Sequence, residues 1–137
     1  MDYFKDSELF TKQEVSTLSP LVLAFVGDSV FDLYMRIHMV KKQRRPVHIL
    51  HRECVKYVNA KSQAETIKRI YDLLSEEEKE IVRRGRNAKS ATSPKNADIQ
   101  DYRYATAFEA LIGYLYLTGR EKRLKDILEL SIDNKKE

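Results

Sequence analysis

The sequence predicts an all-α protein. Glycine and proline are scarce, with four and three residues in a chain of 137, and this favours long uninterrupted elements. Apolar residues recur at helical spacing, and no stretch alternates polar and apolar residues as a half-buried strand does. Hydrophobic residues make up 42% of the chain, which is enough for a core, and the length suits one domain over residues 1–137.

The first predicted helix follows an initial segment, residues 1–17, of polar and mixed composition. Ser19 is a favourable N-cap, and Pro20 suits the first helical position because an N–H would have no partner there. The apolar run Leu21–Met39 follows and ends at Lys41 and Lys42, whose charges favour a helix C-terminus. We therefore expect a helix from Pro20 to the two lysines.

The middle of the chain continues in helical periodicity. Pro46 can open the next helix, in which the apolar residues fall at helical spacing: Val47, Leu50, Cys54, Val55 and Val58. The pattern runs to Leu73 and Leu74, with a break near Asn59. Ser75–Glu78 then matches a capping box, so we expect another helix to start just before Ile81 and Val82.

The last third of the chain predicts a loop and two helices. Residues 86–99 lack apolar periodicity and contain Pro94, so they are interpreted as a loop. A long helix is predicted over Gln100–Leu117, with Gly119 just past its end. An amphipathic helix follows over Arg120–Ile132, and the charged residues 133–137 are expected to fray.

Composition excludes several classes of protein. The longest apolar stretches, such as Leu111–Leu117, are far too short to span a bilayer, so no membrane association is expected. The first residues carry mixed charge without an apolar core, so we expect no secretory signal. A single cysteine, Cys54, fits a reducing cytoplasm and excludes a cysteine-rich zinc site.

Two acidic residues interrupt otherwise apolar helices. Asp28 follows Gly27 in the most hydrophobic predicted helix, where glycine costs about 1 kcal/mol relative to alanine. Close approach of another element at Gly27 would explain the glycine and would leave Asp28 in a lined pocket. Glu109 is likewise flanked by small residues, with Gly113 one turn away.

A buried carboxylate has to be paired, protonated or bound to a cation. If the two helices pack together, Asp28 and Glu109 could share one cation, and oxygen ligands without His or Cys suit Mg²⁺ or Mn²⁺ rather than zinc. The simpler alternative is that each acid is exposed or hydrogen-bonded. His48 and His51 could form half of a metal site, but a solvent face or a phosphate contact is the commoner explanation, and Cys54 is most simply a core residue.

Positive charge is segregated, although the net charge is only +4. Residues 33–52 contain six Lys or Arg and all three histidines without an acid, and residues 83–95 contain five Lys or Arg without an acid. The second stretch mixes cations with Gly, Ser, Thr and Asn, which bond phosphate oxygens. It predicts a nucleic-acid-binding surface, with a solvated loop as the alternative. The candidate binding residues are Arg83, Arg84, Arg86, Asn87, Lys89, Ser90, Lys95 and Asn96.

These motifs resemble a known family. Residues 23–30, LAFVGDSV, and 108–113, FEALIG, resemble the two acidic motifs of the ribonuclease III catalytic domain. The RGRNAKS segment at 84–90, with Pro94–Asn96 and Tyr102–Tyr104, is similar to mini-ribonuclease III, the bacterial branch without a double-stranded-RNA-binding domain. The resemblance covers roughly residues 18–130 and implies a helical bundle like the ribonuclease III endonuclease domain.

The resemblance implies a homodimeric, Mg²⁺-dependent endoribonuclease (Mn²⁺ as a substitute) that cuts both strands of double-stranded RNA, with Asp28 and Glu109 as catalytic metal ligands. It further implies maturation of large-subunit (23S) ribosomal RNA in the cytoplasm, with a ribosomal protein on the substrate as a candidate partner. Full-length relatives carry further acids where this chain has Ala24 and Thr106. The number of metal ions stays open, and so does a replacement ligand among Asp32, Asp98 and Asp101.

Two other functions are compatible with the sequence. The chain could be a non-catalytic module that binds double-stranded RNA or the ribosome with the same fold. It could also be a helical protein-interaction domain whose basic stretches are solvated surface. Metal-dependent cutting of a duplex separates the enzyme from both.

Overall fold

The computed structural model describes residues 9–89 and 98–133, and the regular structure in these ranges is helical, as predicted. The elements are α1 (Lys12–Ser16), α2 (Pro20–Lys42), α3 (Val47–Val55), α4 (Ala60–Ile70), the 3₁₀ turn η1 (Tyr71–Leu73), α5 (Glu76–Asn87), α6 (Ile99–Leu117) and α7 (Glu121–Asp133). Within the described ranges, no helix combines the length and apolar character needed to cross a bilayer.

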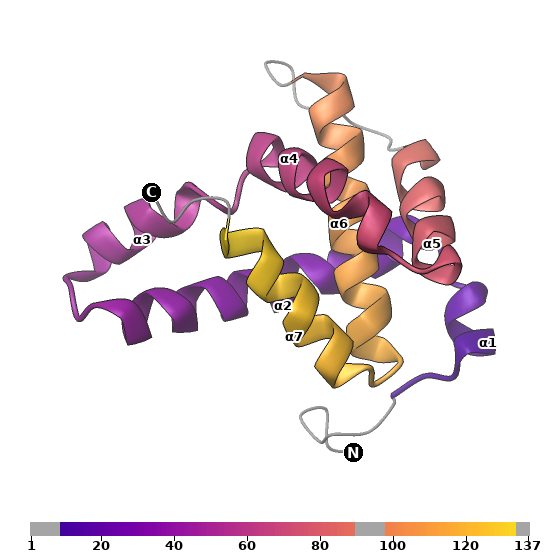
Figure 1. The fold of residues 1–137 in the computed structure, drawn as a ribbon, viewed down its shortest axis with the longest axis horizontal. Helices are drawn as coiled ribbons and strands as arrows, with labels where there is room; N and C mark the ends of the chain where they lie inside the picture. Colours follow the sequence, from indigo (N-terminus) through magenta and orange to yellow (C-terminus); the bar gives the residue numbers. More distant parts are fainter. Residues whose placement is uncertain (1–8, 90–97, 134–137) are drawn as a thin grey trace.

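Helix α6 is the centre of the fold. Helices α2, α4, α5 and α7 all pack against it, and α3 lies along the second half of α2 (Figure 1). Between Ala105 and Leu117 nearly every side chain of α6 is buried, which is why this segment is apolar on all sides. Phe31 of α2 meets Phe108 of α6 edge to face, with ring centroids 5.1 Å apart. The core therefore surrounds a single central helix.

The predicted helix starts are confirmed at the level of individual hydrogen bonds. Ser19 caps α2 by accepting the backbone N–H of Leu21 at 3.1 Å. Ser75 and Glu78 form the reciprocal capping box, with distances of 2.8 and 3.1 Å. The break near Asn59 is also present, because the Asn59 side chain accepts the Ser62 N–H at 2.8 Å and starts α4.

The structure differs from the predicted element limits in four places, one of which is α7, found at Glu121–Asp133 where Arg120–Ile132 was predicted. The segment 1–17 contains the short helix α1, whose capping box pairs Thr11 with Glu14. The loop predicted from 86 is wrong at its start, because α5 continues through Asn87 while burying Ile81, Val82 and Gly85. Helix α6 begins at Ile99, since the Asp98 carboxylate accepts the N–H of Gln100 at 2.7 Å.

Two glycines set the distance between α2 and α6. A Cβ atom placed on Gly27 would lie 1.8 Å from the backbone oxygen of Glu109, and one placed on Gly113 would lie 2.0 Å from the backbone oxygen of Leu23. Both neighbours are backbone atoms, which cannot rotate away as the end of a side chain can. The predicted close approach at Gly27 is therefore confirmed, and its partner is α6 of the same chain.

Gly113→Ala should lower the free energy of unfolding by about 2 kcal/mol, because overpacking against backbone outweighs the better helix propensity of alanine. Urea denaturation followed by far-UV circular dichroism measures the change. Glu65→Ala, an exposed substitution on α4, is the control and should shift stability by less than about 0.5 kcal/mol. An unchanged midpoint for Gly113→Ala would contradict the tight crossing.

Candidate active site

The crossing of α2 and α6 brings the two acids singled out in the sequence together. Asp28 follows Gly27 on α2, and the backbone that Gly27 touches belongs to Glu109 on α6. Asp28 and Glu109 share a side-chain hydrogen bond. The acids, 81 positions apart in the sequence, therefore meet at one point on the surface.

The two carboxyl groups have different surroundings. Asp28 is exposed, contrary to the expected lined pocket, whereas Glu109 is half-buried. Burial, the hydrogen bond to Asp28 and the negative charge of Asp28 raise the pKa of Glu109 to about 9. Without a cation, the pair therefore holds a proton at neutral pH. A divalent cation between the two groups would remove the repulsion that makes this proton necessary.

A third residue, Gln63 of α4, contacts the pair. Its side chain is 5% exposed and donates a hydrogen bond to Glu109, which lowers the pKa of that carboxyl and opposes the effect of Asp28. The sequence interpretation did not include Gln63. A signal was present, because Gln63 lies on the apolar face of α4 with Ala64, Ile67 and Ile70, where a polar residue is unexpected.

Ala24 and Thr106, where the resemblance implies further acids in full-length relatives, add no carboxylate here. Ala24 is buried in the core, and the Thr106 hydroxyl donates to the backbone oxygen of Tyr102 at 3.0 Å. Two of the suggested replacements are engaged elsewhere, because Asp32 pairs with Arg36 at 2.9 Å and the Asp98 carboxylate caps α6. Asp101 lies in the first turn of α6.

The donor set at the crossing fits Mg²⁺ or Mn²⁺. Two carboxylates supply hard oxygen ligands, and among the described residues no cluster of three or more His, Cys, Asp or Glu side chains exists that would suit a fully protein-bound ion. Mg²⁺ commonly takes one or two carboxylates, and water and substrate phosphate complete its shell. His48 and His51 are exposed and belong to no such cluster, while Cys54 is buried as expected.

The candidate RNA-binding residues lie in different environments. Arg83 pairs with Glu80, and Arg84 is held by the backbone oxygen of Leu18 at 3.1 Å, so Arg84 also ties α5 to the turn before α2. Arg86 contacts Asn87 at the end of α5, and Lys89 is exposed just beyond it. The three remaining candidates lie outside the described residues: Ser90, Lys95 and Asn96.

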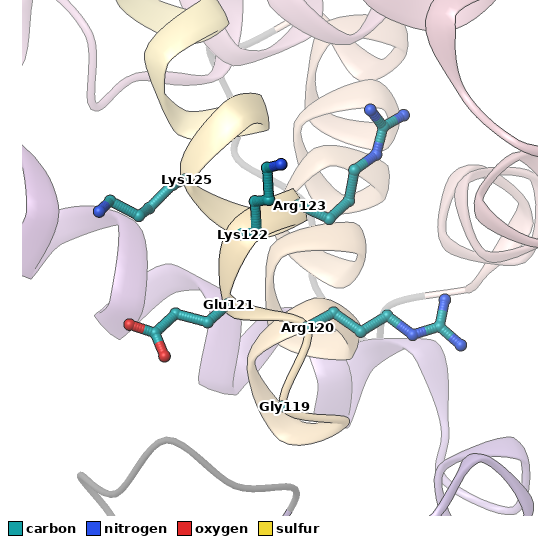
Figure 2. Close-up of a pocket in the computed structure, with 6 residues that line it drawn as sticks. All are labelled: Gly119, Arg120, Glu121, Lys122, Arg123 and Lys125. Carbon is teal, nitrogen blue, oxygen red and sulfur yellow. The ribbon is translucent and has the colours of Figure 1, made fainter.

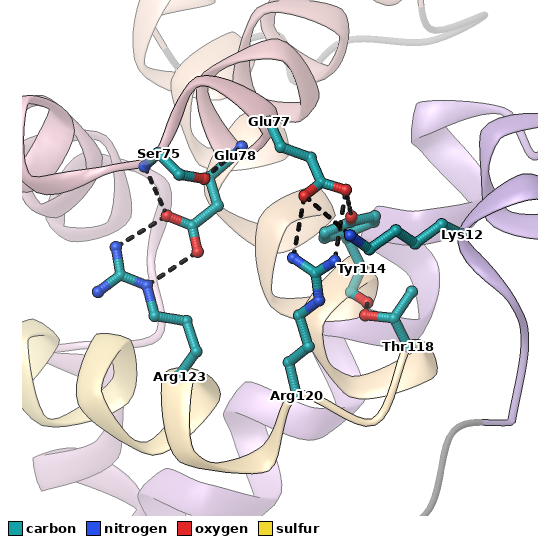
Figure 3. A network of polar contacts seen from close by, with 8 residues as sticks. All are labelled: Lys12, Ser75, Glu77, Glu78, Tyr114, Thr118, Arg120 and Arg123. Atoms are coloured by element: carbon teal, nitrogen blue, oxygen red, sulfur yellow. Dashed lines mark hydrogen bonds and ion pairs between the residues drawn. The ribbon is translucent and has the colours of Figure 1, made fainter.

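A second cluster of cations lines a shallow pocket at the start of α7, where Figure 2 labels Gly119, Arg120, Glu121, Lys122, Arg123 and Lys125. Two of these cations are engaged by α5, as Figure 3 shows. Arg120 contacts Glu77 at 3.2 Å, and Arg123 contacts Glu78 at 2.8 Å. This network fixes α7 to the capping box of α5. Arg120 and Arg123 therefore hold two helices together.

The network also includes a buried acid and a tyrosine. Burial alone would raise the pKa of Glu78, but hydrogen bonds from Arg123 and Ser75 outweigh it and lower the pKa. Tyr114 of α6 donates to Glu77, and its pKa is raised by burial and by that hydrogen bond. Three helices, α5, α6 and α7, are thus joined by charged hydrogen bonds.

Comparison with known proteins agrees with the motifs. The sequence profile of the Ribonuclease III domain matches residues 21–120. Proteins named Mini-ribonuclease 3 are 63% identical in Thermoanaerobacter sp. (96% of this chain, 93% of the relative) and 47% identical in Staphylococcus aureus (83% and 87%). A crystal structure of a protein from Fusobacterium nucleatum matches with 34% identity and a TM-score of 0.79, over 85% of this chain and 90% of that one. The chain therefore belongs to the ribonuclease III family, in its mini-ribonuclease 3 branch, and is a double-strand-specific endoribonuclease.

Proposed function

We propose that this endoribonuclease cuts both strands of double-stranded RNA with Asp28 and Glu109 as ligands of Mg²⁺, with Mn²⁺ as a substitute. The observation that carries the proposal is the hydrogen bond between Asp28 and Glu109. The two acids are far apart in the sequence, and they meet where the backbones of α2 and α6 are in contact. A pair of carboxylates that retains a proton at neutral pH in the absence of a cation is well suited to bind one.

Each acid has a distinct part in this chemistry. The bound ion would activate a water molecule and neutralise charge on the scissile phosphate. Asp28 is exposed, so its carboxylate can lie beside an RNA backbone that approaches α2. Glu109 is half-buried and fixed by hydrogen bonds, so it holds the geometry of the pair while the substrate exchanges.

Asp28→Asn should reduce cleavage about a thousandfold or more, since a metal ion supplies several kcal/mol of transition-state stabilisation. Duplex binding without divalent ions should change little, because the substitution leaves the basic residues in place. Asp126→Asn, which changes an exposed acid on α7 in the same way, is the control, and it should cut normally. Near wild-type cleavage by Asp28→Asn would reject the assignment and favour a non-catalytic binding module.

We also propose that the end of α5 and the residues that follow it hold the RNA backbone. The supporting observation is that Lys89 is exposed just beyond α5 and Arg86 is half-buried at its end, in a stretch without acids. Ser90, Lys95 and Asn96 remain sequence-based candidates. Arg84 is a weaker candidate than the sequence suggests, because the backbone oxygen of Leu18 already accepts its hydrogen bond.

Combined Arg86→Ala and Lys89→Ala should weaken duplex binding and flatten its dependence on salt. Each lost phosphate contact reduces the slope of log K against log[salt] by about 0.9. Lys122→Ala with Lys125→Ala removes the same charge at the start of α7 and should leave the slope nearly unchanged. If the Arg86→Ala and Lys89→Ala double variant bound duplex RNA with the same salt dependence as the wild type, the end of α5 would be excluded as an RNA-binding surface.

A homodimer is the proposed active form. One face of α2 carries apolar side chains that are exposed in the single chain, which we call the α2 stripe: Val22, Phe25, Leu33, Ile37 and Val40. Their spacing places them on one side of the helix, away from core residues such as Phe31. Phe25 is 80% exposed, and exposed apolar side chains gathered on one helix face are typical of an interface.

The α2 stripe continues into a groove between α2 and α3 of about 330 Å³. Val40 belongs to both, and most of the other lining residues are apolar: Val47, Leu50, Cys54, Val55 and Val58. A second copy of the chain is the proposed occupant, since an α2 stripe facing its symmetry mate buries the same surface on both protomers. Two copies also supply one acid pair for each RNA strand.

Phe25→Glu should dissociate the dimer, because a charge buried in an apolar interface without a partner costs about 3 kcal/mol or more, or over a hundredfold in Kd. Sedimentation velocity over a concentration series measures this. Leu73→Glu makes the same kind of change at a 61% exposed leucine outside the stripe and should leave association unchanged. A monomeric wild-type protein at micromolar concentration would count against the dimer.

The proposed natural substrate is the precursor of large-subunit ribosomal RNA in the cytoplasm, with a ribosomal protein bound to that RNA as a candidate partner. The resemblance to the mini-ribonuclease 3 branch supports this choice. Incubation of precursor RNA with the purified protein, with and without Mg²⁺ and with both strands mapped, tests it. Cuts on both strands at the ends of the mature sequence support the proposal, and scattered cuts oppose it.

A further inference from the structure

Gln63 is the one side-chain amide that is fully buried among the described residues. It lies on α4, which packs against α6, and its side chain donates a hydrogen bond to Glu109. A buried amide costs about 1–3 kcal/mol when its partners are missing, so this contact is a specific feature of the site. The inference that follows rests on the proposed role of Glu109 as a metal ligand.

The Glu109 carboxyl is held from two sides. Asp28 on α2 contacts it through one hydrogen bond, and Gln63 on α4 contacts it through another. Three helices therefore meet at this one group. A cation bound by the two acids would replace their direct contact, whereas the N–H of Gln63 would keep its carboxylate acceptor.

The chemistry of an amide suits this position better than a charged donor would. A lysine or arginine would neutralise Glu109 and compete with a divalent cation, whereas an aspartate or glutamate would add repulsion to a pair of acids. A neutral N–H donor fixes one region of the carboxylate and leaves its charge available. Thr106 does not offer this contact in the structure, because its hydroxyl donates to the Tyr102 backbone oxygen.

We propose that Gln63 is a positioning residue that orients Glu109 for the metal ion. Hydrogen-bond partners of metal ligands set ligand orientation, and their loss typically lowers metal affinity or activity about 10- to 100-fold. Gln63 touches neither substrate nor ion in this proposal, so its effect passes through Glu109. Its removal should change the metal dependence of cleavage and kcat while leaving KM for the duplex unchanged.

Gln63→Met tests the proposal, because methionine keeps the length and volume of glutamine and lacks the N–H donor. Thr66→Val is the matched control: it removes a buried hydroxyl one turn along α4, whose bond goes to the backbone oxygen of Ser62 at 3.0 Å. Binding of Mn²⁺ to the protein without RNA is measured by electron paramagnetic resonance. Cleavage is then measured over a Mg²⁺ series, and thermal unfolding without metal reports the fold.

Gln63→Met should weaken Mn²⁺ binding about tenfold or more, raise the Mg²⁺ concentration for half-maximal cleavage and lower kcat, with KM unchanged. Thr66→Val should alter none of these. If Gln63→Met fails to fold, Gln63→Asn keeps the amide but shortens its reach, and it should show the same loss. Wild-type Mn²⁺ affinity in the folded variant, or an equal loss in Thr66→Val, would overturn the proposal.

If the wild-type protein fails to cut duplex RNA, the proposed function fails, while Mn²⁺ binding still decides the role of Gln63.

Discussion

The contact between the backbones of α2 and α6 is the constraint on which the rest of the molecule depends. Gly27 and Gly113 remove the side chains that would hold two helices apart, and each glycine faces a carbonyl oxygen of the other helix. The acid pair exists only because this distance is short. A single packing requirement thus accounts for the costly glycines in apolar helices and for the meeting of Asp28 with Glu109.

The electrostatics of the site follow from unequal burial of two similar groups. Glu109 lies deeper, so desolvation and the neighbouring Asp28 charge favour its protonated form, while the amide of Gln63 favours its ionised form. The result is a carboxyl whose pKa is raised to about 9 but whose orientation is fixed. Asp28 stays exposed toward solvent, where a phosphate can reach it. One fold therefore supplies an anchored carboxyl group and an accessible one.

The sequence predicts features that depend on neighbouring residues, such as helix caps, but it does not predict contacts between residues far apart in the chain. The cap at Ser19 and the box at Ser75–Glu78 depend on neighbouring residues, so their pattern predicted them. The acids were visible as polar interruptions in apolar helices. Gln63 was missed because its partner lies on another helix. The sequence also does not show that a backbone oxygen 66 positions away accepts a hydrogen bond from Arg84, whose role in RNA binding stays a prediction. Exposure of Asp28 likewise depends on the packing of several helices.

The α2 stripe has a consequence for the shape of the cut. Phe25 and Asp28 are three residues apart on one rigid helix, which is about 4.5 Å along its axis. In the proposed dimer, pairing of the two helices therefore fixes the span between the two acid pairs, with no flexible joint between interface and chemistry. The offset between the cleavage positions on the two RNA strands would then be set by the geometry of the dimer and would be independent of the RNA sequence.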